Sequence, residues 1–376
     1  MKNFKIFAAI LTAVFALASC EKANKGPVLQ EPDGFVLNTP AYVNGVYDLS
    51  NSENFILTWS QPDYGFTAAV TYTMQVSKTE DFASFEEFGT STSAKAVVPA
   101  IDLAVALTNI FGADPALYPM TQAIFVRVKA ALTNSGKGEC LSNVIELPQV
   151  KFDFSLPPVN APTDMYLVGD FNGWNWGNST AMVPVWGNSD QLTSFWQIVY
   201  LTANGMKFNS VKEWNGTEVG YDGCKFVDNA GANITKSDDG NLVVGTAGWY
   251  LVRVDAQVSG RDILYTISYN EPKIYLFGVG TVGDVWSAEE ANLFTIPSAA
   301  DGEFVSPAFD QDLAGDDSGC IRACVVLDGH EWWHSEFIVL DGKIAYRGTG
   351  EDQERVGGAA GQKLYLNFSN GTASVK

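Results

Sequence analysis

Short apolar runs with strand-like composition recur along most of the chain. Phe55 to Trp59, Val70 to Val76, Ala123 to Val128 and Trp249 to Val254 are rich in aromatic and β-branched residues or alternate with polar ones, as strands do. Gly, Asn and Pro residues separate these runs and indicate turns. Residues 101–111 instead space their apolar side chains as a helix does. The pattern predicts an all-β chain that contains one short helix.

The first residues have the order of a secretory signal peptide. Lys2 and Lys5 precede an apolar run from Ile6 to Leu17, and Ala18, Ser19 and Cys20 follow it. The run is shorter than the roughly 20 apolar residues of a membrane-spanning helix. Small residues before a cysteine resemble a bacterial lipobox, which implies that Cys20 becomes the lipid-modified first residue of the mature protein. We predict a signal peptide at 1–19 and a lipidated, flexible tether at 20–33.

Proline-containing segments divide the remainder of the chain into domains. The strands predicted in 34–150 resemble the early strands of an immunoglobulin-like or fibronectin-III-like sandwich, in which Trp59 would be a core residue. Pro157 and Pro158 begin a linker, and a second boundary falls near Pro272. The predicted domains are therefore 34–150, 163–270 and 272–376.

The last two segments match each other along their length. Met165 to Gly169 corresponds to Ile274 to Gly278, and Trp176 and Trp286 follow at similar distances. Further on, the triplet centred on Lys207 corresponds to the one centred on Arg322. Such ordered matches indicate a tandem repeat, so we predict that both segments are homologous carbohydrate-binding β-sandwiches.

Tryptophans and cations in the repeat provide the candidate binding chemistry. Gly, Asn and Asp residues around Trp174 and Trp176 predict a turn, which would place both rings near solvent. A flat indole can cover the apolar face of a sugar while Lys or Arg donates to its hydroxyl groups. The candidate glycan-binding residues are Trp174, Trp176, Lys207, Trp214, Trp286, Arg322, Trp332, Trp333 and Arg347.

Other tryptophans have a different expected role. Trp196 and Trp249 lie in apolar strands, so we predict that they belong to the core. Trp186 precedes a Gly-Asn turn, and its sequence context fits a core position and a binding position equally.

Charge and cysteine content restrict the function further. The formal net charge of −20 opposes binding to nucleic acid but does not oppose binding to a neutral polysaccharide. Cys140, Cys224, Cys320 and Cys324 are too scattered for a disulfide framework. A bridge between Cys320 and Cys324 remains an alternative to free thiols, although four residues of extended strand separate a pair by more than a disulfide spans.

Together, the lipoprotein signal, the immunoglobulin-like domain and the tandem sandwiches resemble the SusE/SusF family of the Bacteroidetes starch utilization system. The resemblance implies a non-catalytic outer-membrane lipoprotein without a cofactor, which faces the cell exterior and binds starch beside a SusC/SusD-like transporter complex. Family sites combine stacking aromatics with Arg or Lys donors. The matching residues in this chain are Trp176, Lys207, Trp214, Trp286, Arg322, Trp332 and Arg347.

Several alternatives follow from the same residues. His330 to His334 spells H-E-x-x-H, but a zinc protease needs this string on a helix, and here it lies between two strand-like runs. We therefore predict no metal site. Glycoside hydrolysis needs two positioned carboxylates, and we expect no Asp or Glu to accompany the tryptophans in both repeats, hence no enzyme. A different polysaccharide, or an architectural role in protein contacts, remains open.

Overall fold

The structure is a computed structural model that describes residues 28–376. The predicted signal peptide and Cys20 lie outside the described residues. Two compact units divide after Pro158. Within residues 28–376, no helix has both the length and the apolar character needed to cross a membrane.

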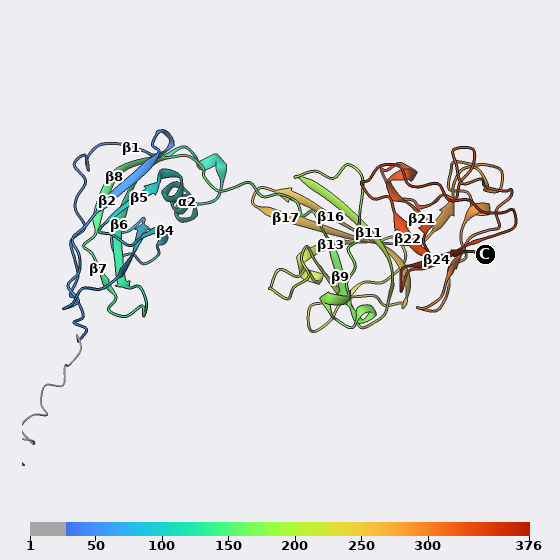
Figure 1. Cartoon of the computed structure of the whole chain (residues 1–376), viewed down its shortest axis with the longest axis horizontal. Helices are drawn as coiled ribbons and strands as arrows, with labels where there is room; N and C mark the ends of the chain where they lie inside the picture. Colours follow the sequence, from blue (N-terminus) through green and yellow to red (C-terminus); the bar gives the residue numbers. More distant parts are fainter. Residues whose placement is uncertain (1–27) are drawn as a thin grey trace, which may run out of the picture. The chain divides into compact units, whose positions relative to one another are not determined.

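The first unit is built on a sheet with the strand order β1-β8-β6-β3-β4, with β7 paired to β6 (Figure 1). A separate pair, β2 and β5, packs with helix α2 over this sheet. The bounds are β1 Tyr47–Asp48, β2 Asn54–Thr58, β3 Val70–Ser77, β4 Glu86–Ser91, β5 Lys95–Pro99, α2 Ala100–Phe111, β6 Met120–Leu132, β7 Cys140–Leu141 and β8 Ile145–Phe152. Helix α2 confirms the helix predicted at 101–111.

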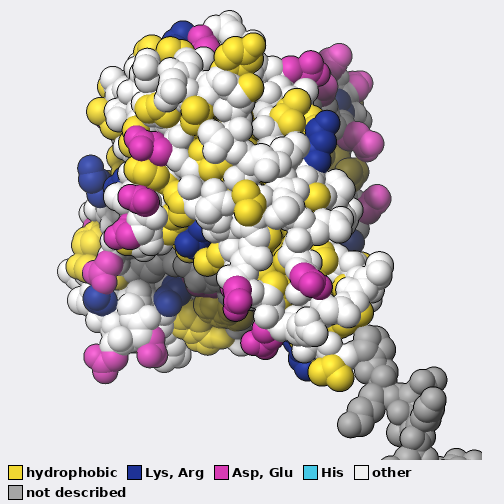
Figure 2. Space-filling model, turned by 90° about the vertical axis from the view of Figure 1, so that its left-hand side faces the viewer, with side chains coloured by type: hydrophobic (Ala, Val, Ile, Leu, Met, Phe, Trp, Pro, Cys, Tyr) yellow, Lys and Arg dark blue, Asp and Glu magenta, His cyan; other side chains and the backbone are white. Residues whose placement is uncertain are grey.

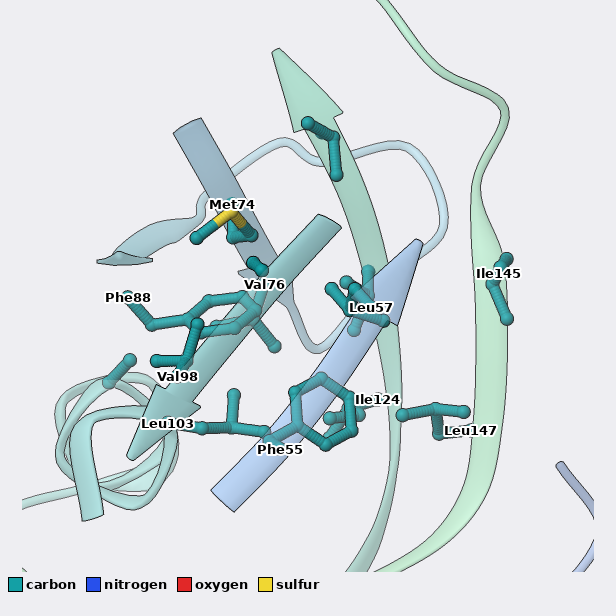
Figure 3. Close-up of a cluster of buried hydrophobic side chains, with 14 of the residues drawn as sticks. Phe55, Leu57, Met74, Val76, Phe88, Val98, Leu103, Ile124, Ile145 and Leu147 are labelled. Carbon is teal, nitrogen blue, oxygen red and sulfur yellow. The ribbon is translucent and has the colours of Figure 1, made fainter. Parts of the chain in front are cut away.

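The core of this unit gathers side chains from all these layers. Figure 3 shows Leu103 of α2 near Phe55 of β2, with side chains from the main sheet around them. Trp59 is 4% exposed, and its ring lies 5.1 Å from that of Tyr72. The predicted core position of Trp59 is therefore confirmed.

The second unit contains three larger sheets. Their strand orders are β10-β11-β16-β17-β13, β14-β15-β12-β9 and β18-β20-β21-β22-β24-β23-β19. The bounds are β9 Tyr166–Gly169, β10 Val183–Pro184, β11 Leu192–Leu201, β12 Met206–Asn209, β13 Cys224–Asp228, β14 Thr235–Lys236, β15 Leu242–Val243, β16 Gly248–Ser259, β17 Asp262–Asn270, β18 Ile274–Leu276, β19 Phe304–Val305, β20 Ala323–Val325, β21 Glu336–Leu340, β22 Lys343–Tyr346, β23 Leu364–Asn367 and β24 Thr372–Val375. The chain is all-β with tandem β domains, as predicted.

We call residues 163–270 the middle module and residues 272–376 the C-terminal module. Segments of the two modules that match in sequence also form equivalent backbone pairs. Lys207 on β12 pairs with Val168 on β9. In the C-terminal module, the backbone N–H of Phe277 donates to the carbonyl of Arg322 over 3.1 Å. Because Phe277 is the counterpart of Val168 in the repeat, Lys207 and Arg322 occupy equivalent ladder positions.

The two modules share one hydrophobic core, which the sequence did not lead us to expect. Strands β11 and β16 turn one set of side chains toward the middle module's own interior. Alternate residues, among them Trp196 and Trp249, pack with Phe304 and Phe337 of the C-terminal module. Strands β11 and β16 are therefore buried on both faces over most of their length, which explains why apolar residues occupy successive positions in them. The predicted core positions of both tryptophans are confirmed.

One face of the molecule shows how its charged side chains are distributed. On the face shown in Figure 2, Asp and Glu side chains lie scattered among uncharged ones, and Lys and Arg side chains stand apart from one another. This distribution fits the net charge of −20. It does not resemble the clustered basic surface that binds nucleic acid.

Candidate functional site

Loops of the middle module form an open hollow with tryptophan walls. Trp174 lies in the loop after β9, and Trp214 lies in the loop after β12. Their ring centroids are 6.4 Å apart with planes at 29°. The hollow has a volume of about 620 Å³, and it is lined by Asp170, Trp174, Asn204, Lys207, Trp214, Asp239 and Asn241. Three of the predicted residues therefore lie together around one hollow.

Trp174 is held in an uncommon backbone conformation. Its φ is 56°, directly after Gly173 with φ 69°. The left-handed region is unfavourable for a bulky side chain and persists only where surrounding contacts impose it. Here the N–H of Trp174 donates to the carbonyl of Gly169 over 2.8 Å, and the N–H of Gly169 donates to the side chain of Asn172 over 3.1 Å. This turn fixes the direction in which the Trp174 ring projects.

Trp176 corrects one expectation from the sequence. We predicted its ring to be near solvent, but it is only 4% exposed. Asn175 caps the short 3₁₀ turn that begins at Trp176 by accepting from the N–H of Gly177 over 2.9 Å. The ring then lies against Trp214, with centroids 5.2 Å apart and planes at 58°. Trp176 therefore supports Trp214, which is 54% exposed.

The C-terminal module repeats this pair of rings. Trp286 and Trp332 have centroids 5.3 Å apart and planes at 54°. In this module the first tryptophan of the pair is the exposed one, whereas in the middle module it is the second. Trp286 is 51% exposed, and Trp332 stacks on the buried Phe277 at 5.7 Å. Both modules thus present one open indole at a fixed angle to a second indole.

The cations of the C-terminal module are held more tightly than the sequence suggested. The guanidinium of Arg322 lies 5.4 Å from the ring centre of Trp332 and 5.8 Å from that of Trp286. Arg322 pairs with Glu336 at 2.5 Å, and Arg347 pairs with the other oxygen of Glu336 at 2.9 Å. Since Glu336 is only 1% exposed, this buried carboxylate orients both guanidinium groups and leaves each with further N–H donors.

A carboxylate follows the second tryptophan in each module, contrary to our expectation. Glu218 comes four residues after Trp214, and Glu336 comes four residues after Trp332. Burial opposes ionisation of Glu218, but backbone N–H groups, led by that of Gly216, and the charge of Lys207 together lower its pKa. The spacing from tryptophan to glutamate, common to both repeats, was the signal in the sequence that could have revealed these residues.

Trp333 lies at the junction between the modules instead of beside Trp286. Its ring is 5.3 Å from that of Trp186 in the middle module. Arg347 lies over the Trp333 ring at 4.8 Å. Of the five residues predicted in the C-terminal module, the structure therefore groups Trp286, Arg322 and Trp332. It connects Arg347 to them through Glu336 and leaves Trp333 as a contact with the neighbouring module.

Only the second part of the H-E-x-x-H string is helical, in a short 3₁₀ helix that spans Trp332–Ser335, while His330 and Glu331 precede that helix. His334 Nδ1 accepts the N–H of Glu331 over 3.2 Å. His330 Nε2 lies 3.4 Å from a guanidinium nitrogen of Arg253 in the middle module. Across residues 28–376, no cluster of three or more His, Cys, Asp or Glu side chains is arranged to hold a metal ion. Cys140, Cys224, Cys320 and Cys324 are free thiols.

The two histidines should make the module junction sensitive to acid. Burial is the main cause that lowers the pKa of both from 6.5, with the charge of Arg253 contributing at His330 and that of Arg347 at His334. Asp255 and Glu331 act in the opposite direction but do not reverse the shift. Protonation would also remove the acceptor at His334 Nδ1. The unfolded chain therefore binds these protons more readily, so stability is lost as pH falls through 6.5 toward the lowered values.

We expect the melting temperature of the second unit to fall between about pH 7.5 and about pH 5.5. The fall should be smaller in a variant with His330→Gln and His334→Gln. Differential scanning calorimetry of both proteins at both pH values provides the measurement. Equal falls in the two proteins would show that the histidines do not contribute to the acid sensitivity.

Comparisons with known proteins identify the family to which the chain is similar. A family model described as SusF/SusE starch-specific carbohydrate-binding modules matches residues 164–266 and 273–374. A model described as SusE outer membrane protein matches residues 22–123. The outer membrane protein SusF of Bacteroides thetaiotaomicron is 39% identical over 245 residues, which cover 62% of this chain and 47% of that protein. This chain thus spans about half the length of that relative. The crystal structure of SusF from Bacteroides thetaiotaomicron matches with a TM-score of 0.49 and 21% identity, over 91% of this chain and 99% of the other.

Proposed function

This chain belongs to the SusE/SusF family, and from that membership we propose that it is a glycan-binding, non-catalytic lipoprotein of the outer membrane. Its ligand would be starch or a related α-1,4-linked glucan. The main support for this proposal is the geometry of indoles and cations that recurs in both modules. Each module sets two indoles at a similar angle, and a cation occupies the same ladder position in both.

The chemistry of each site suits a neutral sugar chain. An exposed indole can cover the apolar face of one sugar ring, and a second indole inclined to it can follow the bend of an α-1,4-linked chain. The planes of the two rings that would meet the ligand are at 54° in the C-terminal module (Trp286 and Trp332) and at 29° in the middle module (Trp174 and Trp214). Lys207 or Arg322 can donate to adjacent hydroxyls, and nearby carboxylates can accept from hydroxyl groups. In the C-terminal module, Trp286 and Trp332 would provide the stacking surface and Arg322 the donor. In the middle module, Trp174 and Trp214 would stack with Lys207 as donor.

The carboxylates are better suited to binding than to hydrolysis. Glu336 is committed to two arginines, and Glu218 accepts backbone N–H groups of Asn215 and Gly216 at 2.5 and 3.1 Å. Asp170 borders the hollow of the middle module, but Val279 stands at its place in the repeat. A glycosidase requires a pair of carboxylates on either side of the scissile bond, one of them free to transfer a proton. A mechanism that used the two equivalent glutamates, Glu218 and Glu336, would lack that pair.

Anchoring would come from the lipid predicted on Cys20. Acyl chains on that residue, followed by a polar tether, would hold the folded units at the membrane surface. We propose that the protein faces the cell exterior and works beside a SusC/SusD-like transporter complex. Both parts of this proposal rest on family membership and on the leader sequence.

Isothermal titration with maltoheptaose, a levan oligomer and a xylan oligomer tests the ligand class. We expect saturable binding of maltoheptaose at the tryptophan site of each module, with much weaker heats for levan and xylan. A parallel reducing-sugar assay should detect no release from maltoheptaose. Preferential binding of levan or xylan would refute the glucan assignment, and steady sugar release would refute the non-catalytic one.

A further inference from the structure

A second hollow lies between the two modules of the second unit. We call it the junction cleft, and its volume is about 550 Å³. The middle module contributes residues of β11, including Gln197 and Tyr200, together with Asp170. The C-terminal module contributes Tyr346 at the end of β22 and Phe368 after β23. Its size falls within the roughly 300–1,000 Å³ of small-molecule sites, which form preferentially at domain interfaces.

Two hydrogen-bond acceptors at the junction cleft lack partners. Oδ1 of Asp170 and Oε1 of Gln197 are both buried without a hydrogen bond. The orientation of each side chain is nevertheless fixed. Asp170 accepts from Thr202 and, over 3.1 Å, from Asn204 through its other oxygen, and Gln197 donates to Thr180 over 3.3 Å. Buried acceptors without donors are rare because they cost free energy. A ligand that carries several donor groups would satisfy them.

Aromatic rings form part of the remaining wall of the junction cleft, beside aliphatic and polar residues. Tyr200 and Trp249 meet edge to face at 5.5 Å, and Phe368 lies 6.5 Å from Trp249. Tyr346 closes the other side, where its ring packs against Trp196 at 5.5 Å and Phe337 at 5.7 Å. The residue is still 38% exposed, so the part of it that these contacts leave open can meet a ligand. Aromatic faces beside oriented acceptors match the two surfaces of a sugar, which are apolar C–H faces and a rim of hydroxyl donors. The carboxylate of Asp170 disfavours an anionic ligand.

We propose that the junction cleft is a third binding site, which takes a short neutral oligosaccharide between the two modules. The ligand would stack on Tyr346 and donate hydroxyl hydrogen bonds to Asp170 and Gln197. Asp170 also borders the hollow of the middle module, so the two sites are neighbours. This site goes beyond the proposed function, since none of the tryptophans assigned to the glucan sites lines it.

The test starts from a full-length chain in which Trp174, Trp214, Trp286 and Trp332 are all replaced by alanine. We expect this background to bind maltotriose at one site per chain, measured by isothermal titration. Adding Tyr346→Ala or Gln197→Leu should weaken that binding at least tenfold. Adding Phe226→Ala should not, because Phe226 is similarly exposed, at 39%, and lies on β13 outside the junction cleft.

Soaking crystals of the unmodified chain with maltotriose provides a second measurement that needs no substitution. Density for the sugar beside Tyr346 supports the proposal. An empty junction cleft in crystals whose tryptophan sites are occupied overturns it, as does a background chain that is folded by circular dichroism but does not bind maltotriose. Both negative results leave the proposed function intact. That function fails separately if the unmodified chain does not bind maltoheptaose.

Discussion

A variant with Trp214→Ala and Trp286→Ala is expected to lose most of its affinity for maltoheptaose. These are the open indoles of the two modules, 54% and 51% exposed. A central aromatic contact in a binding site is commonly worth about 2 kcal/mol or more, so each site should weaken by roughly 30-fold. Each single variant should retain one site of nearly normal affinity. Isothermal titration gives both the stoichiometry and the affinity for all three proteins.

The matched control for this experiment is Trp186→Ala. Trp186 is 43% exposed but contacts Trp333 and His334 at the junction. It therefore removes a comparable open indole without touching either glucan site. Normal maltoheptaose binding by the variant lacking Trp214 and Trp286 would refute the assignment of these rings. An equal loss in the control would point to a general effect of removing surface tryptophans.

Patterning along the chain was enough to predict much of the fold. Strand-like runs and turn residues predicted the all-β class, and helical spacing over 101–111 predicted α2, which spans Ala100–Phe111. These features depend on local periodicity, which a sequence displays directly. The shared core of the second unit does not depend on local periodicity. A buried tryptophan is equally apolar whether it packs inside its own module or against the neighbouring one. The sequence could therefore not reveal that Trp196 and Trp249 pack against the C-terminal module.

The candidate sites were predicted in outline, and their finer geometry was not. The repeat correctly paired Lys207 with Arg322, because equivalent ladder positions keep their order in both copies. The inward direction of Trp176 depends on a capped 3₁₀ turn, and side-chain direction in such a turn does not follow a simple period. Glu336 was overlooked because its role depends on two arginines that are distant in sequence.

Trp333 illustrates a second limit of reasoning from a repeat. It directly follows Trp332, so both were assigned to the glucan site. Neighbouring residues in a short turn project in different directions, and Trp333 meets Trp186 of the other module. The contact depends on how the modules pack together, which is information that neither copy of the repeat contains.

Replacing Trp249 with alanine is expected to destabilise both modules of the second unit together. The ring is 7% exposed, lies 5.2 Å from Phe304 of the C-terminal module, and its Nε1 donates to the carbonyl of Ala299 over 3.0 Å. Loss of a buried tryptophan typically costs about 3–5 kcal/mol of unfolding free energy. Urea unfolding followed by hydrogen exchange should show earlier opening of β16 and of β19.

The control is Trp59→Ala, which removes a ring of similar burial, 4% exposed, from the first unit. It should lower the stability of that unit and leave the exchange of β16 and β19 unchanged. If Trp249→Ala accelerated exchange only in the middle module, the two modules would unfold independently. Such a result would contradict a single core, because a cavity beside Phe304 must weaken the side chains of the C-terminal module that surround it.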